Sequence, residues 1–362
     1  MSQSLFSLRK SRTMSLHYQT IHDRRKRQSG LSLVELMISM ALSLLLMLGI
    51  LQVFNANKES FEISRDLNDL QDNAHLALSL MAESIRMAGH WGGVSSDVVE
   101  FGKTALTVFP GACSAAWIFQ STEGLRGYEG ATKFGEVNSL PSGCIDERDY
   151  QEGSDLLVVR YADSRALLTD HQVDNVKYAK RNIVRSSAGQ AAYVFSGAHH
   201  KDAFSRISEN AKAYNMLYVT HLFFLSPCVE SKLSLSESSS NCVEEAPTLM
   251  RLTLTGNRFV QQSLVPGVEQ MQFDYGLDLN NDHQIDEYLA AHLVEDWQDV
   301  LSVRISLIIR GQKKDLSINR PGKEYLMLGD TADTGNGFVV GDEVKHFRRK
   351  VYQREVVLRN RL

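Results

Sequence analysis

The stretch Gly30-Leu31-Ser32-Leu33-Val34-Glu35-Leu36 opens an apolar run that extends to Phe54, and Glu35 is its one charged residue. A run of this length can cross the hydrocarbon core of a bilayer, so it predicts a membrane-spanning helix. A carboxylate inside such a run costs about 2.5–3.5 kcal/mol on insertion scales, which favours a functional role with a partner. If the chain is cleaved after Gly30, the new α-amine of Leu31 lies within about one and a half helical turns of Glu35 and can neutralise it.

The residues before this run are strongly basic. Residues 1–30 hold seven Lys or Arg and one Asp, whereas the whole chain of 362 residues has a net charge of −4. Positive charge beside a span is retained in the cytoplasm, so the acidic remainder is expected on the other side of the membrane. That acidic remainder also argues against nucleic-acid binding. An ordinary signal anchor explains the charge and the apolar run, but it explains neither Gly30 nor Glu35. A cleaved Sec-type signal peptide fits less well, because no small-x-small cleavage site follows the apolar run.

Basic residues, Gly30, Glu35 and the apolar run together resemble the class III signal of type IV prepilins and pseudopilins. In that family a prepilin peptidase cuts after the Gly and methylates the new N-terminus. The resemblance therefore implies cleavage between Gly30 and Leu31, N-methylation of Leu31, and a role for Glu35 in setting subunit register. Leu31 departs from the Phe that the family usually has at this position.

Two further regions resemble PilW-type minor pilins. They are the segment from Ile85 to Gly93 and the C-terminal third, with its block from Val268 to Arg310 and its Arg359-Asn360-Arg361 ending. The resemblance implies a type IV pilin-like fold, with a cleaved leader over residues 1–30 and a periplasmic head over residues 91–362.

One long helix is predicted over residues 31–88, which contain no Pro. Residues 31–56 are apolar on nearly all sides and form the transmembrane or filament-core part. Residues 57–90 are amphipathic, with apolar residues recurring at spacings of three and four on the side expected to pack on a sheet. These are Ile63, Leu67, Leu70, Ala74, Ala77, Met81, Ile85 and Ala88. Gly89 suits the end of the helix, and Trp91 is expected to cover it.

Short apolar or alternating runs after this helix predict strands. They lie at residues 155–161, 191–195, 217–225, 249–254, 268–275 and 300–310, with a last one around 351–358. Residues 94–155 are expected to be irregular. One long helix followed by short strands indicates an α+β protein with an antiparallel sheet in its head domain.

The four cysteines are Cys113, Cys144, Cys228 and Cys242. None forms a Cys-x-x-Cys motif, and a translocated head lies in an oxidising compartment. We therefore expect disulfides, and the pairs Cys113–Cys144 and Cys228–Cys242 are favoured because each closes a local loop. Free buried cysteines are the alternative.

Residues 278–286 form a candidate calcium loop. Oxygen-bearing side chains stand at every second position, which suits a cation that takes six to eight oxygen ligands. The expected ligands are Asp278, Asn280, Asp282, Asp286 and the backbone carbonyl of Gln284. Compared with an EF-hand loop, the turn Gly is replaced by His and the twelfth position is Leu. A polar turn that binds no metal is the alternative.

No motif of a hydrolase, metalloprotease or nucleotide-binding protein is in place, so the chain is not expected to be an enzyme. The resemblance implies a minor pilin of the inner membrane that helps to prime type IV pilus assembly, at the pilus tip. Expected partners are other minor pilins, the major pilin, a tip adhesin, the prepilin peptidase and the inner-membrane assembly platform. A J-type minor pseudopilin of type II secretion and a calcium-dependent accessory adhesin are the alternatives.

Overall fold

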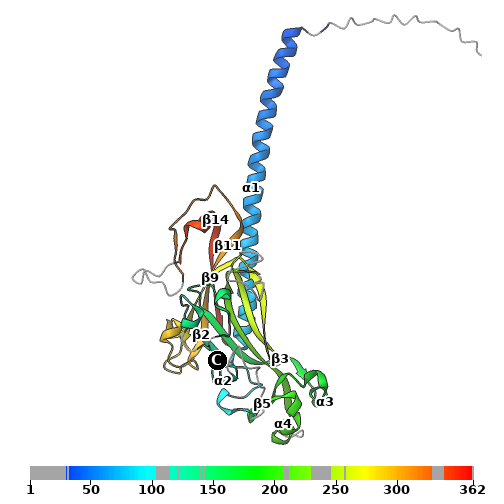
Figure 1. Cartoon of the computed structure of the whole chain (residues 1–362), viewed down its shortest axis with the longest axis vertical. Helices are drawn as coiled ribbons and strands as arrows, with labels where there is room; N and C mark the ends of the chain where they lie inside the picture. Colours follow the sequence, from blue (N-terminus) through cyan, green and yellow to red (C-terminus); the bar gives the residue numbers. More distant parts are fainter. Residues whose placement is uncertain are drawn as a thin grey trace, which may run out of the picture. The chain divides into compact units, whose positions relative to one another are not determined.

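A computed structural model describes residues 30, 32–102, 115–120, 122–137, 140–141, 143–207, 212–229, 246–256, 258–327 and 338–360. The chain forms two units, Met1–Phe61 and Glu62–Leu362, and each is described by itself. Figure 1 shows one long helix, α1, and the strands and short helices that follow it.

The helix predicted over residues 31–88 is α1, Leu33–Met87. In the second unit, its apolar stripe is buried at Leu70, Ala74, Ala77, Met81 and Ile85, as predicted. Leu67 was expected in the same stripe, but it is 43% exposed. The predicted stripe begins at Ile63 but is fully buried only from Leu70, about two turns later.

Within the part of the chain that the structure describes, the large sheet has eight strands. They are β1 Val99–Phe101, β2 Leu125–Tyr128, β3 Leu156–Leu168, β4 Asn182–Ser187, β5 Ala191–Ser196, β6 Ala213–Ser226, β7 Thr248–Thr255 and β8 Arg258–Pro266. Six of them follow the order β1-β5-β4-β6-β3-β2, while β7 pairs with both β6 and β8. The β1–β5 pair is parallel and the other pairs are antiparallel.

A second, antiparallel sheet has the order β10-β9-β11-β14. Its strands are β9 Val268–Leu277, β10 Glu287–Leu289, β11 Val300–Lys314 and β14 Phe347–Val357, and a small pair joins β12 Glu324–Tyr325 to β13 Phe338–Val339. The chain passes from β8 to β9 through Gly267, whose φ is +85°. A Cβ atom there would lie 2.7 Å from the carbonyl oxygen of Arg310, so only Gly fits.

Short helices connect the strands. The α-helices are α2 Ala115–Ile118, α3 Asp170–Val173 and α4 His200–Arg206. Single 3-10 turns are found at Ser96–Val98, Phe134–Glu136, Glu147–Asp149, Val176–Tyr178, Gly197–His199, Ala291–Leu293 and Asp342–Val344.

The described residues of the second unit form three hydrophobic clusters. In the largest, α1 residues such as Met81 pack with inward residues of both sheets, including Phe223 and Phe273. The second lies on the other face of the large sheet, where Trp117 and Tyr150 of the connecting segments cover Phe224. Strands such as β3 are therefore buried on both faces, which explains their nearly continuous apolar sequence.

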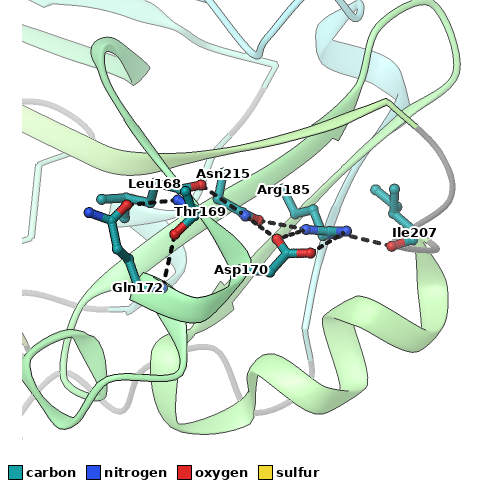
Figure 2. A network of polar contacts seen from close by, with 7 residues as sticks. All are labelled: Leu168, Thr169, Asp170, Gln172, Arg185, Ile207 and Asn215. Carbon is teal, nitrogen blue, oxygen red and sulfur yellow. Dashed lines mark hydrogen bonds and ion pairs between the residues drawn. The ribbon is translucent and has the colours of Figure 1, made fainter.

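Arg185, which is 1% exposed, joins the segments that form the third cluster (Figure 2). Its Nη1 donates to Asp170 Oδ1 at 2.6 Å and to Asn215 Oδ1 at 2.9 Å, and its Nε donates to the carbonyl of Ile207 at 2.9 Å. The guanidinium also lies 4.5 Å from the ring centroid of Phe204. One buried side chain thus joins the start of α3, the end of α4 and strands β4 and β6.

Each predicted strand has a counterpart in the structure, and the α+β class is confirmed. Two expectations need correction. The segment 94–155 is not wholly irregular, because β1 and β2 join the large sheet there. Among the described residues, the expected antiparallel sheet is two larger sheets, which are antiparallel apart from the β1–β5 pair. Strands β4 and β8 were not predicted from the sequence. They carry polar residues such as Arg185 and Gln262, so their sequences lack the apolar pattern by which a strand is recognised.

Candidate functional site

The predicted cleavage site lies at the start of α1. Gly30 and Ser32 are exposed, and Leu31 lies outside the described residues. The backbone N–H of Ser32 donates to Glu35 Oε2 at 2.9 Å. Ser32-Leu33-Val34-Glu35 has the Ser-x-x-Glu spacing of a capping box, and this bond is one half of that motif. Glu35 therefore has a local partner in the uncleaved chain, and the Ser-x-x-Glu spacing is the sequence signal that could have predicted it.

The first half of α1 presents apolar side chains on all sides. Its large hydrophobic residues from Leu33 to Phe54 are 46–74% exposed, and the helix is long and apolar enough to cross a membrane. Its few hydroxyls bond within the helix, as when Ser43 Oγ donates to the carbonyl of Ser39 at 2.6 Å. Such a surface is stable only in lipid or against other apolar helices.

The C-terminal end of α1 is closed by residues from distant parts of the chain. Gly89 adopts a φ of +69°, and its N–H donates to the carbonyl of Arg160 at 3.0 Å. The side-chain amide of Asn360 donates to the carbonyl of Ala88 at 3.1 Å and to that of Arg86 at 3.4 Å. Asn360 thus satisfies carbonyl groups that a helix end leaves without partners. The sequence did not predict this capping role of Asn360, although the Arg359-Asn360-Arg361 ending resembles that of PilW-type pilins.

Trp91 covers the same helix end. It is 1% exposed and stacks on Tyr218 with ring centroids 5.8 Å apart. The neighbouring His90 is partly buried, and this burial lowers its pKa despite a hydrogen bond with Asn360. Both residues therefore pack at the helix end, as expected.

The candidate calcium loop joins β9 to β10. Asp278 follows β9 directly and is 5% exposed. Its carboxylate accepts the N–H of Asp282 at 3.1 Å and that of His283 at 2.8 Å. At the other end of the loop, Asp286 Oδ2 accepts the N–H of Leu279 at 2.8 Å. The alternate oxygen side chains thus organise the turn by accepting its own backbone N–H groups.

Two residues in this loop have left-handed backbone conformations. Asn281 has a φ of 61° and His283 a φ of 62°. His283 stands where an EF-hand loop has its turn Gly, and it adopts the sign of φ for which that Gly is used. The missing Gly therefore does not prevent the turn.

The donor set of the loop consists of oxygens, which suits a hard cation such as Ca²⁺. Burial acts against ionisation of Asp278, but the backbone N–H groups around it lower the pKa of its carboxyl overall. Among the described residues, however, no three His, Cys, Asp or Glu side chains form a group that could hold a metal. The loop has the right ligand types, and its side chains are engaged with its own backbone.

Cys144 and Cys228 are buried, and both take part in disulfide bonds. Cys113 and Cys242 lie outside the described residues. The pairs Cys113–Cys144 and Cys228–Cys242 therefore stay a prediction.

The sequence matches two family models. Residues 25–51 match the prokaryotic N-terminal methylation motif, which contains Gly30, Leu31 and Glu35. Residues 234–360 match the type IV pilus-assembly protein W family. Together, the two matches support a type IV pilus-related pilin of the PilW type. No curated protein and no solved structure matches it significantly.

The two matches account for different parts of this PilW-type pilin. The methylation motif and the single candidate span in the described part of the chain make it a single-pass inner-membrane pilin. The PilW match includes strands β7 to β14, the loop 278–286 and Asn360. Residues 52–233, which form most of α1 and of the large sheet, lie outside both matches.

Proposed function

We propose that this protein is a minor pilin that helps to initiate type IV pilus assembly, as part of a minor-pilin complex at the pilus tip. The observation that carries the proposal is the combination of the methylation motif with the PilW match on one chain. The size of the head supports a position at the tip, because a bulky head is easier to accommodate at the end of a thin filament than along it. The role is structural, and no catalytic step is assigned.

The assembly route follows from the apolar half of α1. The prepilin peptidase cleaves after Gly30 and methylates Leu31, and the helix then anchors the protein with its head in the periplasm. On assembly, the exposed apolar side chains of residues 33–54 exchange lipid for other pilin helices. Other minor pilins, the major pilin and a tip adhesin are the proposed partners, together with the inner-membrane assembly platform.

Glu35 sets the register of this packing. In the uncleaved chain its carboxylate accepts the N–H of Ser32. After cleavage, the α-amine of Leu31, on the same or an adjoining subunit, offers a charged partner in a medium of low dielectric constant. A charge-assisted hydrogen bond there is about twice as strong as a neutral one. Subunits that align this pair are therefore favoured over those that leave the carboxylate buried without a partner.

A deletion strain complemented with wild type, Glu35→Gln or Glu35→Ala tests this role. Glu35→Gln is the matched variant, because its amide oxygen can still accept the N–H of Ser32 but cannot neutralise the amine. We expect sheared surface pili with wild type and few or none with either variant. Full piliation with Glu35→Gln would show that the charge of Glu35 is not required.

Secretion assayed in the same cultures separates the alternatives. Loss of pili with normal secretion supports the minor-pilin role. Loss of secretion with normal pili would identify a pseudopilin of type II secretion instead. Normal pili and normal secretion in the deletion strain would contradict a role in filament assembly and favour an accessory adhesin.

For the loop 278–286 we propose Ca²⁺ binding that stabilises the β9–β10 connection. The ion would be held by the side chains of Asp278, Asn280, Asp282 and Asp286 and by the backbone carbonyl of Gln284. On binding, these side chains would turn from the loop's own N–H groups toward the ion. The all-oxygen donor set and the left-handed φ of His283 support this proposal.

Thermal unfolding of the full chain in detergent, with Ca²⁺ or with a chelator, tests the loop. We expect Ca²⁺ to raise the melting temperature of wild type and not that of the double variant Asp278→Ala and Asp282→Ala. Mg²⁺ is the control ion, since it demands a stricter octahedral geometry. An equal response of wild type and double variant would show that the loop is a turn without a metal.

A further inference from the structure

The large sheet has a gap along one edge of β6. On that edge, β4 pairs with β6 from Ala213 to Leu217, and β7 pairs with β6 from His221 to Ser226. Residues 218–220 of β6 lie between these two ladders, and they pair with β3 on the opposite edge. The start of β4 and the end of β7 therefore face each other across a short interruption of the sheet.

A pocket of about 240 Å³ occupies this gap. It is lined by Arg181 and Asn182 at the start of β4, by the middle of β6, and by the end of β7 with Thr253 and Thr255. Gly256, at the turn after β7, approaches the carbonyl of Lys180 so closely that a Cβ atom would lie 3.2 Å from it. The pocket walls therefore come from β4, β6 and β7, and the pocket is smaller than the roughly 300–1,000 Å³ of drug-sized sites.

The lining is cationic. Arg181 and Arg251 both line the pocket, and no Asp or Glu does so among the described residues. Arg181 is exposed, and its guanidinium forms no ion pair or hydrogen bond with the part of the chain that the structure describes. Arg251 donates through Nε and Nη2 to the amide oxygen of Gln262, at 3.1 and 2.7 Å, and not to a carboxylate. Two guanidinium groups therefore line one small pocket to which the described residues contribute no carboxylate.

Asn182 adds a second observation. It is 4% exposed and lines the same pocket, yet neither its Nδ2 nor its Oδ1 has a hydrogen-bond partner. A buried amide left without partners destabilises a protein and is rare without a compensating use. The amide can donate and accept, and the hydroxyls of Thr253 and Thr255 can do the same.

We propose that this pocket binds a small polyhydroxylated carboxylate, of the size of a sugar acid. The guanidinium groups of Arg181 and Arg251 match a carboxylate in charge and geometry. The amide of Asn182 and the two Thr hydroxyls match the neighbouring hydroxyls of the ligand, which donate and accept in turn. The pocket lies in the second unit and uses no residue assigned above to processing, assembly or calcium.

Binding of D-glucuronate and of D-glucose to the full chain in detergent tests the proposal. The two probes have the same ring and differ at the carboxylate. At constant ionic strength, we expect saturable binding of glucuronate by calorimetry, with a higher melting temperature, and no such effect of glucose. Equal effects of the two sugars, or no binding of glucuronate, would overturn the proposal.

Three variants locate the binding. Arg181→Gln should weaken glucuronate about tenfold, since it removes one charge-assisted contact from an exposed side chain that supports no other residue. Lys180→Gln is the matched control, because it removes an adjacent positive charge that does not line the pocket. Asn182→Leu should abolish binding while the unliganded protein stays as stable or becomes more so, because an amide without partners is removed. Equal weakening by Lys180→Gln would show a general charge effect only. Unchanged affinity in both pocket variants would overturn the proposal, because the ligand would then bind elsewhere on the protein.

Discussion

His221 shows at the scale of one residue how burial sets a charge state. It lies beneath α1, with Nδ1 3.3 Å from Ser84 Oγ, and its ring meets Tyr161 edge-on. Burial, followed by the positive charges of Arg251 and Arg165, lowers the pKa of His221 to about 3. The imidazole is therefore neutral in the folded protein at any pH at which the protein is expected to work.

This lowered pKa predicts a pH dependence of stability. Below about pH 6.5 the unfolded chain protonates His221 and the folded chain does not, so stability is lost as the pH falls toward 3. Between pH 7 and pH 5 the loss amounts to about 2 kcal/mol. Denaturant unfolding at the two pH values should show this decrease in wild type and a smaller one in His221→Gln. Because all other groups are shared, an identical decrease in both proteins would contradict the assignment.

Among the elements, α1 depends on Asn360 for its C-terminal end. Asn360→Ala removes the two side-chain bonds to the carbonyls of Ala88 and Arg86, and we expect a loss of about 0.5–1.5 kcal/mol in the free energy of unfolding. Arg359→Ala is the control, since this neighbour is exposed. Hydrogen exchange should increase at the last turn of α1 only in Asn360→Ala. If the two variants behave alike, the contact does not stabilise the helix end.

A second prediction at this scale concerns α3 and α4, which depend on Arg185. Removing one member of a buried ion pair costs about 3–5 kcal/mol, and the lower end applies here because the side chain of Asp170 is 34% exposed. We therefore expect Arg185→Leu to destabilise the protein by about 3 kcal/mol and to expose residues 168–207 to protease or hydrogen exchange.

Arg206→Gln provides the contrast for Arg185. Arg206 pairs with Glu100 at 2.9 Å, but both side chains are more than half exposed. Such a pair contributes about 0–1 kcal/mol. Comparable losses in the two variants would mean that burial of Arg185 does not determine its contribution.

In the second unit as a whole, Asp155 connects the two sheets. It precedes β3 of the large sheet, and its carboxylate accepts the N–H of Phe273 in β9 and the N–H of Gly130, both at 2.9 Å. Burial, followed by the charge of Glu129, raises the pKa of Asp155 well above its usual range. Its effect on stability therefore has the opposite sign to that of His221: stability falls as the pH rises above about 3.9.

Asp155→Ala should cost about 2–4 kcal/mol, because two backbone N–H groups lose their partner in a buried place. Glu147→Ala is the matched control. Glu147 also accepts two backbone N–H groups, from Phe134 and Gly135, but Glu147 is itself exposed, so water can reach its partners when it is removed. Urea unfolding of the full chain compares the two. A loss in Asp155→Ala no larger than in Glu147→Ala would argue against a role in joining the sheets.

The sequence by itself determined the features that depend on local pattern. The bounds of α1 follow from its apolar run, its later three-and-four spacing and Gly89. Strands such as β3, β9 and β11 follow from apolar runs, because burial of both faces leaves few polar residues in them. The predicted processing site follows from Gly30 and from a charged residue, Glu35, that an apolar helix would otherwise exclude.

Only the tertiary structure decided the features that join distant residues. Asn360 caps a helix 272 residues earlier in the chain, and Arg185 appears polar in sequence although it is the centre of a packed cluster. The pocket beside β6 exists because β4 and β7 share one edge of that strand and stop short of each other, which no local pattern encodes. Local propensity and hydrophobicity act over a few residues, whereas strand order and the pairing of buried polar groups are set by the packing of the complete chain.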